Sequence, residues 1–417
     1  MAKALVLTVG MSVASEVFAI QSVQPDFVAF LVSPDSHAKV DDIAEQTDLK
    51  PSQMHIETVA DDPAALGQLV LAFHRAHRWA ASQVGPNGQV YVNPTAGRKW
   101  MSTGLTLAAS RLDASLVYVD VAFQDGKPNP STMRLVELGN PDDATGGLAA
   151  TPAVALFNRG DYAGAAEAFH RLKPSHSAHR LLYQGLGRTA AALGDWDRFS
   201  HLAEPKVADR LAEAAADVRQ AADELGLTKV VDWCSQIDRL SRAILEMPRF
   251  EGNHPPSREI IGDLLANARR RIRSARYDDA AARLYRALEG VGQLLLAQRG
   301  IRTGAVPWSD LPPDAVARFR AGRRNPDAPL PDKIGLTDAF GLARALACDG
   351  ADLFFDEGGF VFQNDIEIRN QSVLAHGLTP VGKKAAEKFA ERLDERLRGL
   401  GIQTSTWQVP NLPDLAG

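Results

Sequence analysis

Cysteine and long apolar runs are scarce in this sequence. The 417 residues include two cysteines, Cys234 and Cys348, far apart in the chain. This scarcity excludes a disulfide framework and a cysteine-rich zinc site, and it favours a cytoplasmic location. No stretch of about 18 apolar residues occurs, so we expect no membrane span. The apolar run in residues 1–10 is too short for a signal peptide.

An excess of positive charge is also missing, since the net charge is −5. This balance argues against a protein that coats nucleic acid through charge alone, so an anionic ligand needs a local site. The charge is nevertheless uneven. Residues 1–150 contain 10 Lys/Arg and 16 Asp/Glu, whereas residues 258–302 contain 10 Arg and 5 Asp/Glu. An acidic N-terminal part is therefore followed by a basic C-terminal one.

The composition, with 45% hydrophobic and 23% charged residues, is that of a globular protein of two or three domains. In the first 140 residues, short β-branched or aromatic runs alternate with amphipathic stretches at 64–82 and 99–112. The runs predict strands at 5–9, 27–32, 54–59, 89–92, 116–123 and 135–138. This alternation predicts an α/β domain at residues 1–145, with a mainly parallel sheet and helices on both faces. Residues 139–147 read as a linker.

Residues 150–250 are alanine-rich and predict a helical connecting domain. The triplet Gly160-Asp161-Tyr162 recurs as Gly194-Asp195-Trp196 after 34 residues, which is the tetratricopeptide period. We predict that each triplet lies at a turn between two helices of a repeat-like hairpin. Coincidence in an all-helical spacer is the alternative. A linker with three prolines follows at 247–257.

Residues 255–417 predict a third, all-α domain. One long helix is expected at 259–299 with a break near Tyr277, followed by an irregular insertion at 302–335. Two further helices are expected at 365–376 and 381–400, with Thr379-Pro380 as the cap and first turn of the last one. The arginine run 269–273 is either a solvated helix face or a contact to RNA phosphates.

The first candidate site is the turn after the strand at 89–92. The helix start, Lys99 and the close backbone approach allowed by Gly97 would favour an anion such as phosphate. A second turn ends the first strand, and strands one and four of such a sheet can flank one ligand. Two ordinary strand-to-helix turns are the alternative. The candidate ligand-binding residues are Gly10, Met11, Ser12, Asn93, Thr95, Ala96, Gly97, Arg98, Lys99 and Met101.

The second candidate site comprises Arg369, Asn370 and His376. On one helix, a spacing of seven residues would place Arg369 and His376 on the same face, about 10 Å apart. A guanidinium can stabilise charge on phosphate oxygens, and a histidine can move protons near neutral pH. This pair suits RNA cleavage by the neighbouring 2′-hydroxyl without a metal. The alternative is a solvated arginine with a histidine at a helix C-terminus.

These two motifs resemble a known pair of domains. The segment from Asn93 to Ser102 resembles the signature of CARF domains, the Rossmann-like sensors of CRISPR systems, and departs from it at Ala96 and Arg98. Arg369, Asn370 and His376 resemble the HEPN ribonuclease motif, and residues 280–289 resemble a long HEPN helix. The order of the motifs resembles that of the CARF–HEPN ribonucleases of type III CRISPR systems.

The resemblance implies an endoribonuclease that cyclic oligoadenylate activates and that cleaves single-stranded RNA in antiviral defence. It also implies a homodimer, no metal and no cofactor, and products with 2′,3′-cyclic phosphate and 5′-hydroxyl ends. Neither DNA nor a membrane is an expected partner. The CARF domain could also degrade its activator. Two alternatives stay open: a non-catalytic nucleotide-sensing regulator and a helical scaffold.

Overall fold

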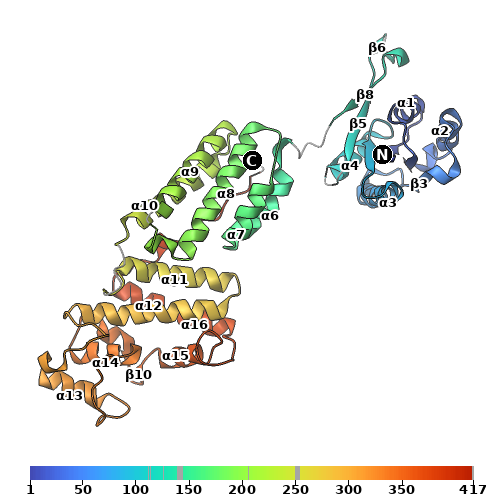
Figure 1. Cartoon of the computed structure of the whole chain (residues 1–417). Coiled ribbons are helices and arrows are strands. Elements are labelled where there is room, and N and C mark those ends of the chain that lie inside the picture. The colour runs from blue at the N-terminus through green and yellow to red at the C-terminus, as the bar shows by residue number, and fades with distance from the viewer. Residues whose placement is uncertain are drawn as a thin grey trace. The chain divides into compact units, whose positions relative to one another are not determined.

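The computed structural model of the chain describes residues 1–110, 112, 114–124, 126–138, 144–204, 206–248 and 254–415 (Figure 1). Its internal contacts form two compact units. Unit 1 comprises residues 1–148 and 173–176, and unit 2 comprises residues 149–172 and 177–417. The predicted linker residues 139–143 and 249–253 lie outside the described residues. Within the described ranges, no helix is both long and apolar enough to cross a membrane.

Unit 1 is built on a six-stranded sheet with the order β3-β2-β1-β4-β5-β8. Strands β1 to β5 run parallel, and β8 pairs antiparallel with β5. This Rossmann-like order confirms the α/β fold predicted for the N-terminal part. The predicted strand at 116–123 is shorter, because its last residue belongs to a separate hairpin, β6–β7. The strands are β1 (Lys3–Thr8), β2 (Phe27–Val32), β3 (Met54–Thr58), β4 (Gln89–Asn93), β5 (Ser115–Asp120), β6 (Phe123–Gln124), β7 (Lys127–Pro128) and β8 (Arg134–Glu137).

Helices cover both faces of this sheet. Side chains alternate between the two faces of a strand, so the apolar residues of β1 contribute to two cores, one on each face of the sheet. Leu5 and Leu7 pack in one core with residues of α1 and α2. Ala4 and Val6 pack in the other with residues of α3 and α4. The helices are α1 (Ala14–Val23), α2 (Lys39–Thr47), α3 (Leu66–Val84) and α4 (Lys99–Ala109).

Unit 2 is predominantly helical, and one continuous apolar cluster runs through it. Helices α7 to α10 pack successively, each against the next, and α11 packs against α12 and α16 (Figure 1). The only strands described in this unit are the two short ones, β9 (Phe355–Asp356) and β10 (Gly359–Phe360). The helices are α6 (Gly147–Asn158), α7 (Tyr162–Arg171), α8 (Ser177–Asp197), α9 (Lys206–Glu224), α10 (Thr228–Glu246), α11 (Arg258–Arg273), α12 (Tyr277–Ala297), α13 (Pro313–Ala321), α14 (Leu336–Ala345), α15 (Gln363–Asn370) and α16 (Lys383–Gly399).

The two glycine-containing triplets have different surroundings. The first triplet forms the turn between α6 and α7, where Gly160 has a φ of +79° and Asp161 caps α7 by accepting a hydrogen bond from the Gly164 N–H at 3.0 Å. The second triplet lies inside α8, so the prediction of a turn there is wrong. Trp196 is fully buried, and this apolar anchor extends the helix to Asp197.

The predicted break in the long C-terminal helix is present. Helix α11 ends at Arg273 and α12 begins at Tyr277, and Ala275 between them has a left-handed φ of +58°. Two details of the C-terminal predictions are wrong. The insertion at 302–335 contains helix α13, which the proline at its first position favours. The predicted last helix is present, but it begins at Lys383 with Gly382 as its cap. Thr379 does not cap it, because the Thr379 N–H donates to the Gln371 carbonyl in the preceding loop.

The C-terminal tail packs against the helices of the same unit. Asn158 in α6 exchanges two hydrogen bonds with the backbone of Leu412, at 3.0 and 2.7 Å. The Trp233 indole N–H in α10 donates to the Pro410 carbonyl at 3.1 Å. Trp407 is buried. Residues far apart in sequence are therefore held together by the last described segment.

Candidate functional sites

The two predicted turns of unit 1 meet at the carboxyl edge of the sheet. Strands β1 and β4 are neighbours there, with Leu7 opposite Asn93. The Thr8 hydroxyl donates to the Ala96 carbonyl at 2.5 Å. A Cβ placed on Gly10 would lie 3.1 Å from the Gly97 nitrogen, so the two turns are in close contact. The strand order places this contact at the topological switch point, where ligands bind in open α/β sheets.

Glycine is needed at position 97 for two reasons. Its φ of +83° is strained for any residue with a side chain. An added Cβ would also lie 3.1 Å from the Cβ of Thr8. The turn at residues 95–98 is therefore held in one shape against strand β1.

Some of the predicted ligand-binding residues support the turn instead of facing solvent. The buried Asn93 side chain accepts a hydrogen bond from the Thr95 N–H at 2.8 Å, and the Thr95 hydroxyl accepts one from the Val119 N–H at 2.8 Å. Met101 is 1% exposed and packs in the apolar core with α3, which places it out of reach of a ligand at the surface.

The exposed residues of the two turns are Met11, Ser12, Arg98 and Lys99. Arg98 forms an ion pair with Asp61, so a ligand would have to compete for its guanidinium. Lys99 is the first residue of α4 and has no acidic partner in the described part of the chain. Lys99 and the N–H groups of this helix start form the part of the site best suited to an anion.

Glu16 supports the first turn and was not singled out from the sequence. Its carboxylate accepts hydrogen bonds from the Gly10 N–H at 2.8 Å and from the Ser15 hydroxyl at 2.6 Å. Burial raises the pKa of Glu16, although both hydrogen bonds lower it. A carboxylate in the first turn of α1 was the signal that could have revealed this contact.

The second candidate site is not built on one helix. Helix α15 ends at Asn370, and the prediction of a single helix to residue 376 is wrong. The chain folds back instead, and the His376 N–H donates to the Asn370 carbonyl at 3.1 Å. Gly377 permits this loop, since a Cβ there would lie 2.0 Å from the Gln371 carbonyl oxygen. Asn370 and Ser372 favour the end of the helix, because their short polar side chains compete for backbone hydrogen bonds.

The fold-back holds the backbone of His376 against that of Asn370, whose side chain contacts Arg369. Arg369 donates to the Asn370 side-chain oxygen at 3.1 Å, and its guanidinium carbon lies 4.2 Å from the centre of the Tyr285 ring. This cation–π contact fixes the arginine on α12. The Arg369 Nε is buried and has no hydrogen-bond partner among the described residues. The His376 side chain is exposed.

Helix α15 is anchored by a charged pair and an aromatic ring. One guanidinium nitrogen of Arg392 in α16 donates to both carboxylate oxygens of Asp365, at 2.6 and 2.5 Å. Burial raises the pKa of Asp365, while Arg392 lowers it. Phe362 precedes the helix and is fully buried against Phe389. These contacts position Arg369, and spacing in the sequence does not reveal them.

The arginine run 269–273 is mainly structural. Arg270 donates to Asp197 at 2.7 Å, and Arg271 forms an ion pair with the same buried carboxylate. Arg269 pairs with Asp394 at 3.0 Å. Only Arg273 of this run is exposed and without an acidic partner among the described residues. The run is thus neither a solvated face nor a continuous contact surface.

Residues 252–399 match a family model described as the Csm6 HEPN domain. No curated protein matches the chain. Among solved structures, Csm6 of Enterococcus italicus bound to cyclic hexa-2′-fluoro-hexa-dAMP is 13% identical, with a TM-score of 0.49 over 98% of this chain and 97% of that one. Can2 from Sulfobacillus thermosulfidooxidans in complex with cyclic tetra-adenylate is 15% identical, with a TM-score of 0.24 over 48% of this chain and 68% of that one.

The family match covers both the helix that carries Arg369 and the loop that carries His376. The solved structures are too dissimilar, with both TM-scores below 0.5, to support a conclusion about this fold. The Rossmann-like order of unit 1 comes from its own strand pairing. The chain thus joins a Rossmann-like N-terminal unit to a C-terminal region that matches the Csm6 HEPN model over residues 252–399, in agreement with its resemblance to CARF–HEPN CRISPR effectors.

Proposed function

We propose that this chain is an endoribonuclease that cleaves single-stranded RNA when cyclic oligoadenylate binds its N-terminal unit. Its role would be antiviral defence in the cytoplasm, in a type III CRISPR system. The observation that carries the proposal is the HEPN match over residues 252–399, which includes Arg369, Asn370 and His376. Asn370 is hydrogen-bonded to the Arg369 side chain and, through its backbone, to His376.

The geometry supports a metal-independent transesterification. The RNA 2′-hydroxyl attacks the adjacent phosphorus, the bond to the 5′-oxygen breaks, and a 2′,3′-cyclic phosphate and a 5′-hydroxyl result. Arg369 stabilises the negative charge that develops on the phosphate oxygens. His376 takes the proton of the 2′-hydroxyl or gives one to the leaving oxygen. Asn370 orients Arg369 through the 3.1 Å hydrogen bond.

A homodimer would complete this site. Three exposed apolar residues flank His376 in the sequence after α15: Val373, Leu374 and Leu378 are 58%, 51% and 88% exposed. Such a patch favours contact with another protein surface. In the proposed dimer, the loops of two copies face each other and two Arg369/His376 pairs form one composite site.

The activator would bind at the paired turns of unit 1. Lys99 and the N-terminus of α4 would hold its phosphates, and the exposed Met11 and Ser12 would contact the ring from the other turn. Activation then requires that the ring bind two arrangements of the dimer with different affinity. Slow cleavage of the activator at the same turns is a further proposed activity.

The deciding test is degradation of a fluorescent single-stranded RNA by the full chain, with excess EDTA. A panel of cyclic oligoadenylates should include rings of four and six adenylates. We expect cleavage with one ring size and cyclic phosphate ends on the products. No cleavage with any ring would favour a non-catalytic regulator or a scaffold, and an absolute need for magnesium would contradict the mechanism.

Activator cleavage has a separate test. A variant that combines Arg369→Ala and His376→Ala is incubated with the active ring, and linear adenylates are sought by chromatography. Their formation would assign this activity to unit 1. An intact ring after long incubation would reject it.

A further inference from the structure

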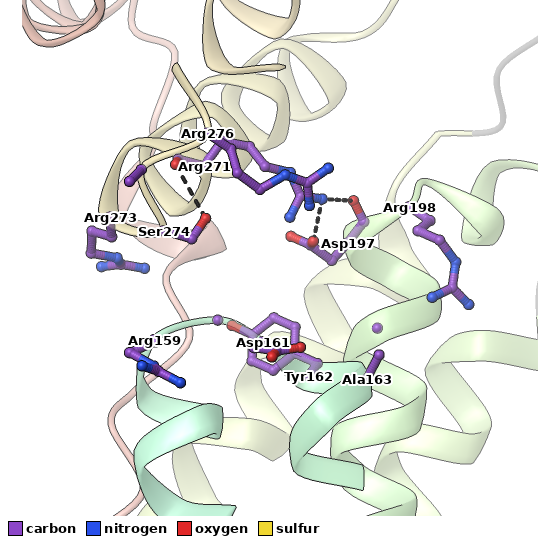
Figure 2. A pocket seen from close by; sticks show the side chains of 13 residues that line it. Arg159, Asp161, Tyr162, Ala163, Asp197, Arg198, Arg271, Arg273, Ser274 and Arg276 are labelled. Atoms are coloured by element: carbon purple, nitrogen blue, oxygen red, sulfur yellow. Dashed lines mark hydrogen bonds and ion pairs between the residues drawn. The ribbon is translucent and has the colours of Figure 1, made fainter. Parts of the chain in front are cut away.

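A second basic site lies in unit 2, away from the residues described above. It is an open pocket of 630 Å³ where three parts of the chain meet. They are the α6–α7 turn with Arg159, the end of α8 with Arg198, and the α11–α12 turn with Arg273 and Arg276 (Figure 2). Together with Arg271, these residues define what we call the arginine pocket.

The lining of the arginine pocket is rich in positive charge. It contains five arginines and two aspartates, Asp161 and Asp197. Both aspartates are already engaged, since Asp161 caps α7 and Asp197 pairs with buried Arg270 and Arg271. Positive charge therefore dominates the exposed wall.

Of the pocket arginines, Arg159 and Arg273 are available to bind a ligand, whereas Arg198 and Arg276 have acidic partners. Arg198 pairs with Asp195 at 2.6 Å, and Arg276 pairs with Asp279. By contrast, Arg159 and Arg273 are exposed, and neither has an acidic partner in the part of the chain that the structure describes. Two unpaired guanidinium groups in one pocket are suited to bidentate binding of phosphate oxygens.

The described lining of the pocket offers no exposed aromatic face on which a nucleobase could stack. Its one aromatic lining residue is Tyr162, which is 4% exposed. Figure 2 shows the Tyr162 ring between Arg159 on one side and Arg198 on the other, with Arg271 and Arg276 above it. Stacking on an aromatic face is the usual way to bind a base. The pocket is therefore built for a phosphate group and not for reading sequence.

The pocket is connected to the candidate nuclease site through α12. Tyr277 follows the pocket residue Arg276 directly, and it packs with Ile272 in a small apolar cluster that includes Ile368, the neighbour of Arg369. Tyr285, which holds Arg369, lies eight residues further along α12, which is about 12 Å along the helix. An extended RNA strand at the nuclease site is long enough to reach the pocket.

We propose that the arginine pocket binds backbone phosphates of single-stranded RNA and holds the substrate next to the nuclease site. This inference rests on the proposed function, since it gives that activity a second contact to RNA. The contact is independent of sequence and weakens with salt. Arg159 and Arg273 are its principal residues.

The test uses fluorescence anisotropy with a labelled 2′-O-methyl RNA, which lacks the attacking hydroxyl and so reports binding without cleavage. The full chain is compared with a double variant, Arg159→Gln with Arg273→Gln, across a salt series. We expect about tenfold weaker binding. We also expect the plot of the logarithm of the binding constant against the logarithm of the salt concentration to be shallower by about 1.4, since two phosphate contacts are lost. On unmodified RNA, KM should rise while kcat is kept.

The matched control is Arg239→Gln with Arg242→Gln, two exposed arginines of α10 that do not line the pocket. Equal affinity and slope in the pocket variant and this control would overturn the proposal, as would a wild-type chain that binds no RNA. AMP, inorganic phosphate and an unlabelled RNA oligomer are compared as competitors at the same total concentration of phosphate groups. If AMP or inorganic phosphate displaces the labelled RNA as well as the oligomer does, the pocket binds free phosphate and the RNA assignment fails.

The same assays separate the two proposals. If RNA binding depends on the pocket but no activator triggers cleavage of unmodified RNA, the proposal of RNA binding by the pocket is retained and the proposed nuclease function is rejected. If cleavage is activated normally and the pocket variant binds and cleaves as the wild type does, the nuclease function stands and the pocket fails.

Discussion

The two candidate sites differ in what holds them together. In unit 1, the backbones of the turns after β1 and β4 approach each other closely at Gly10 and Gly97, and buried or half-buried side chains hydrogen-bond to that backbone. In unit 2, the site depends on side chains. Arg369 lies on the ring of Tyr285, and His376 reaches Asn370 through a loop that follows a short helix.

This difference determines how each site responds to change. A site that depends on two backbones lying close together fails when a glycine at the contact acquires a Cβ. A site built from two or three side chains on a loop loses its chemistry when one of them is truncated. The predictions below test that contrast.

The largest effect is expected for His376→Ala. The imidazole would move protons in the transition state, so its loss should lower activator-dependent RNA cleavage by about 10²- to 10⁴-fold. Gln371→Ala in the same exposed loop is the control, and it should retain most of the activity. Initial rates on fluorescent RNA at saturating activator measure both. Undiminished cleavage by the histidine variant would remove His376 from the mechanism.

A smaller effect is expected for Gly97→Ala in unit 1. The left-handed φ of +83° costs an alanine about 1–2 kcal/mol, and its Cβ would press against Thr8. We expect at least tenfold weaker binding of the cyclic activator, with normal cleavage once activator saturates. Gly67→Ala is the matched control, because a Cβ on that exposed helical glycine meets no atom within 4 Å.

Binding of a labelled activator and the activation curve are the two measurements for these glycine variants. Wild-type affinity in Gly97→Ala would show that the turn at 95–98 does not form the activator site. A loss in Gly67→Ala of the same size would show that the effect is not specific to the turn.

The smallest effect concerns buried charge in unit 2. Asp263 and His201 face each other at 3.6 Å. Burial raises the pKa of Asp263 to about 7 from an ordinary 3.8, although Arg270 opposes the shift. Burial lowers the pKa of His201 to about 4 from 6.5. Between pH 4 and 6.5, Asp263 is thus protonated in the folded chain and ionised in the unfolded chain. His201 is neutral in the folded chain and protonated in the unfolded chain.

The two contributions to stability oppose each other and can be separated. Relative to the wild type, the free energy of unfolding of Asp263→Asn should rise as pH increases from about 4.5 to 6.5, because the opposing contribution of the aspartate is removed. Relative to the wild type, the free energy of unfolding of His201→Gln should fall over the same range, because the contribution of the histidine is removed. Each slope is at most about 1.4 kcal/mol per pH unit. Urea unfolding at several pH values measures both, and slopes of the same sign would contradict the assignment.

Much of unit 1 could be predicted from the sequence, because its signals are local. Apolar runs such as Phe27–Val32 mark buried strands, and Gly97 after a strand marks a turn at the sheet edge. The structure agrees with these expectations closely. It differs at Met101, where the helical face that points into the core was not distinguished from the face toward the ligand.

The site in unit 2 was harder to predict, because distant contacts define it. The residues Arg369 and His376 were recognisable as a motif, but the helix was expected to continue through both. The loop depends on the approach of Gly377 to Gln371 and on the anchoring of Asp365 by Arg392. The prediction of a turn at Gly194-Asp195-Trp196 was wrong for a related reason, since the burial of Trp196 outweighs the local turn signal.

The C-terminal tail has a consequence for how unit 2 can come apart. Asn158 and Trp233, both before α11, are bonded to Leu412 and Pro410, both after α16. The last described segment of the chain therefore binds α6 and α10, the helices that precede α11 in unit 2. A protease that cut the chain between α10 and α11 would release no free fragment in native buffer. The two pieces would co-migrate until denaturant separated them.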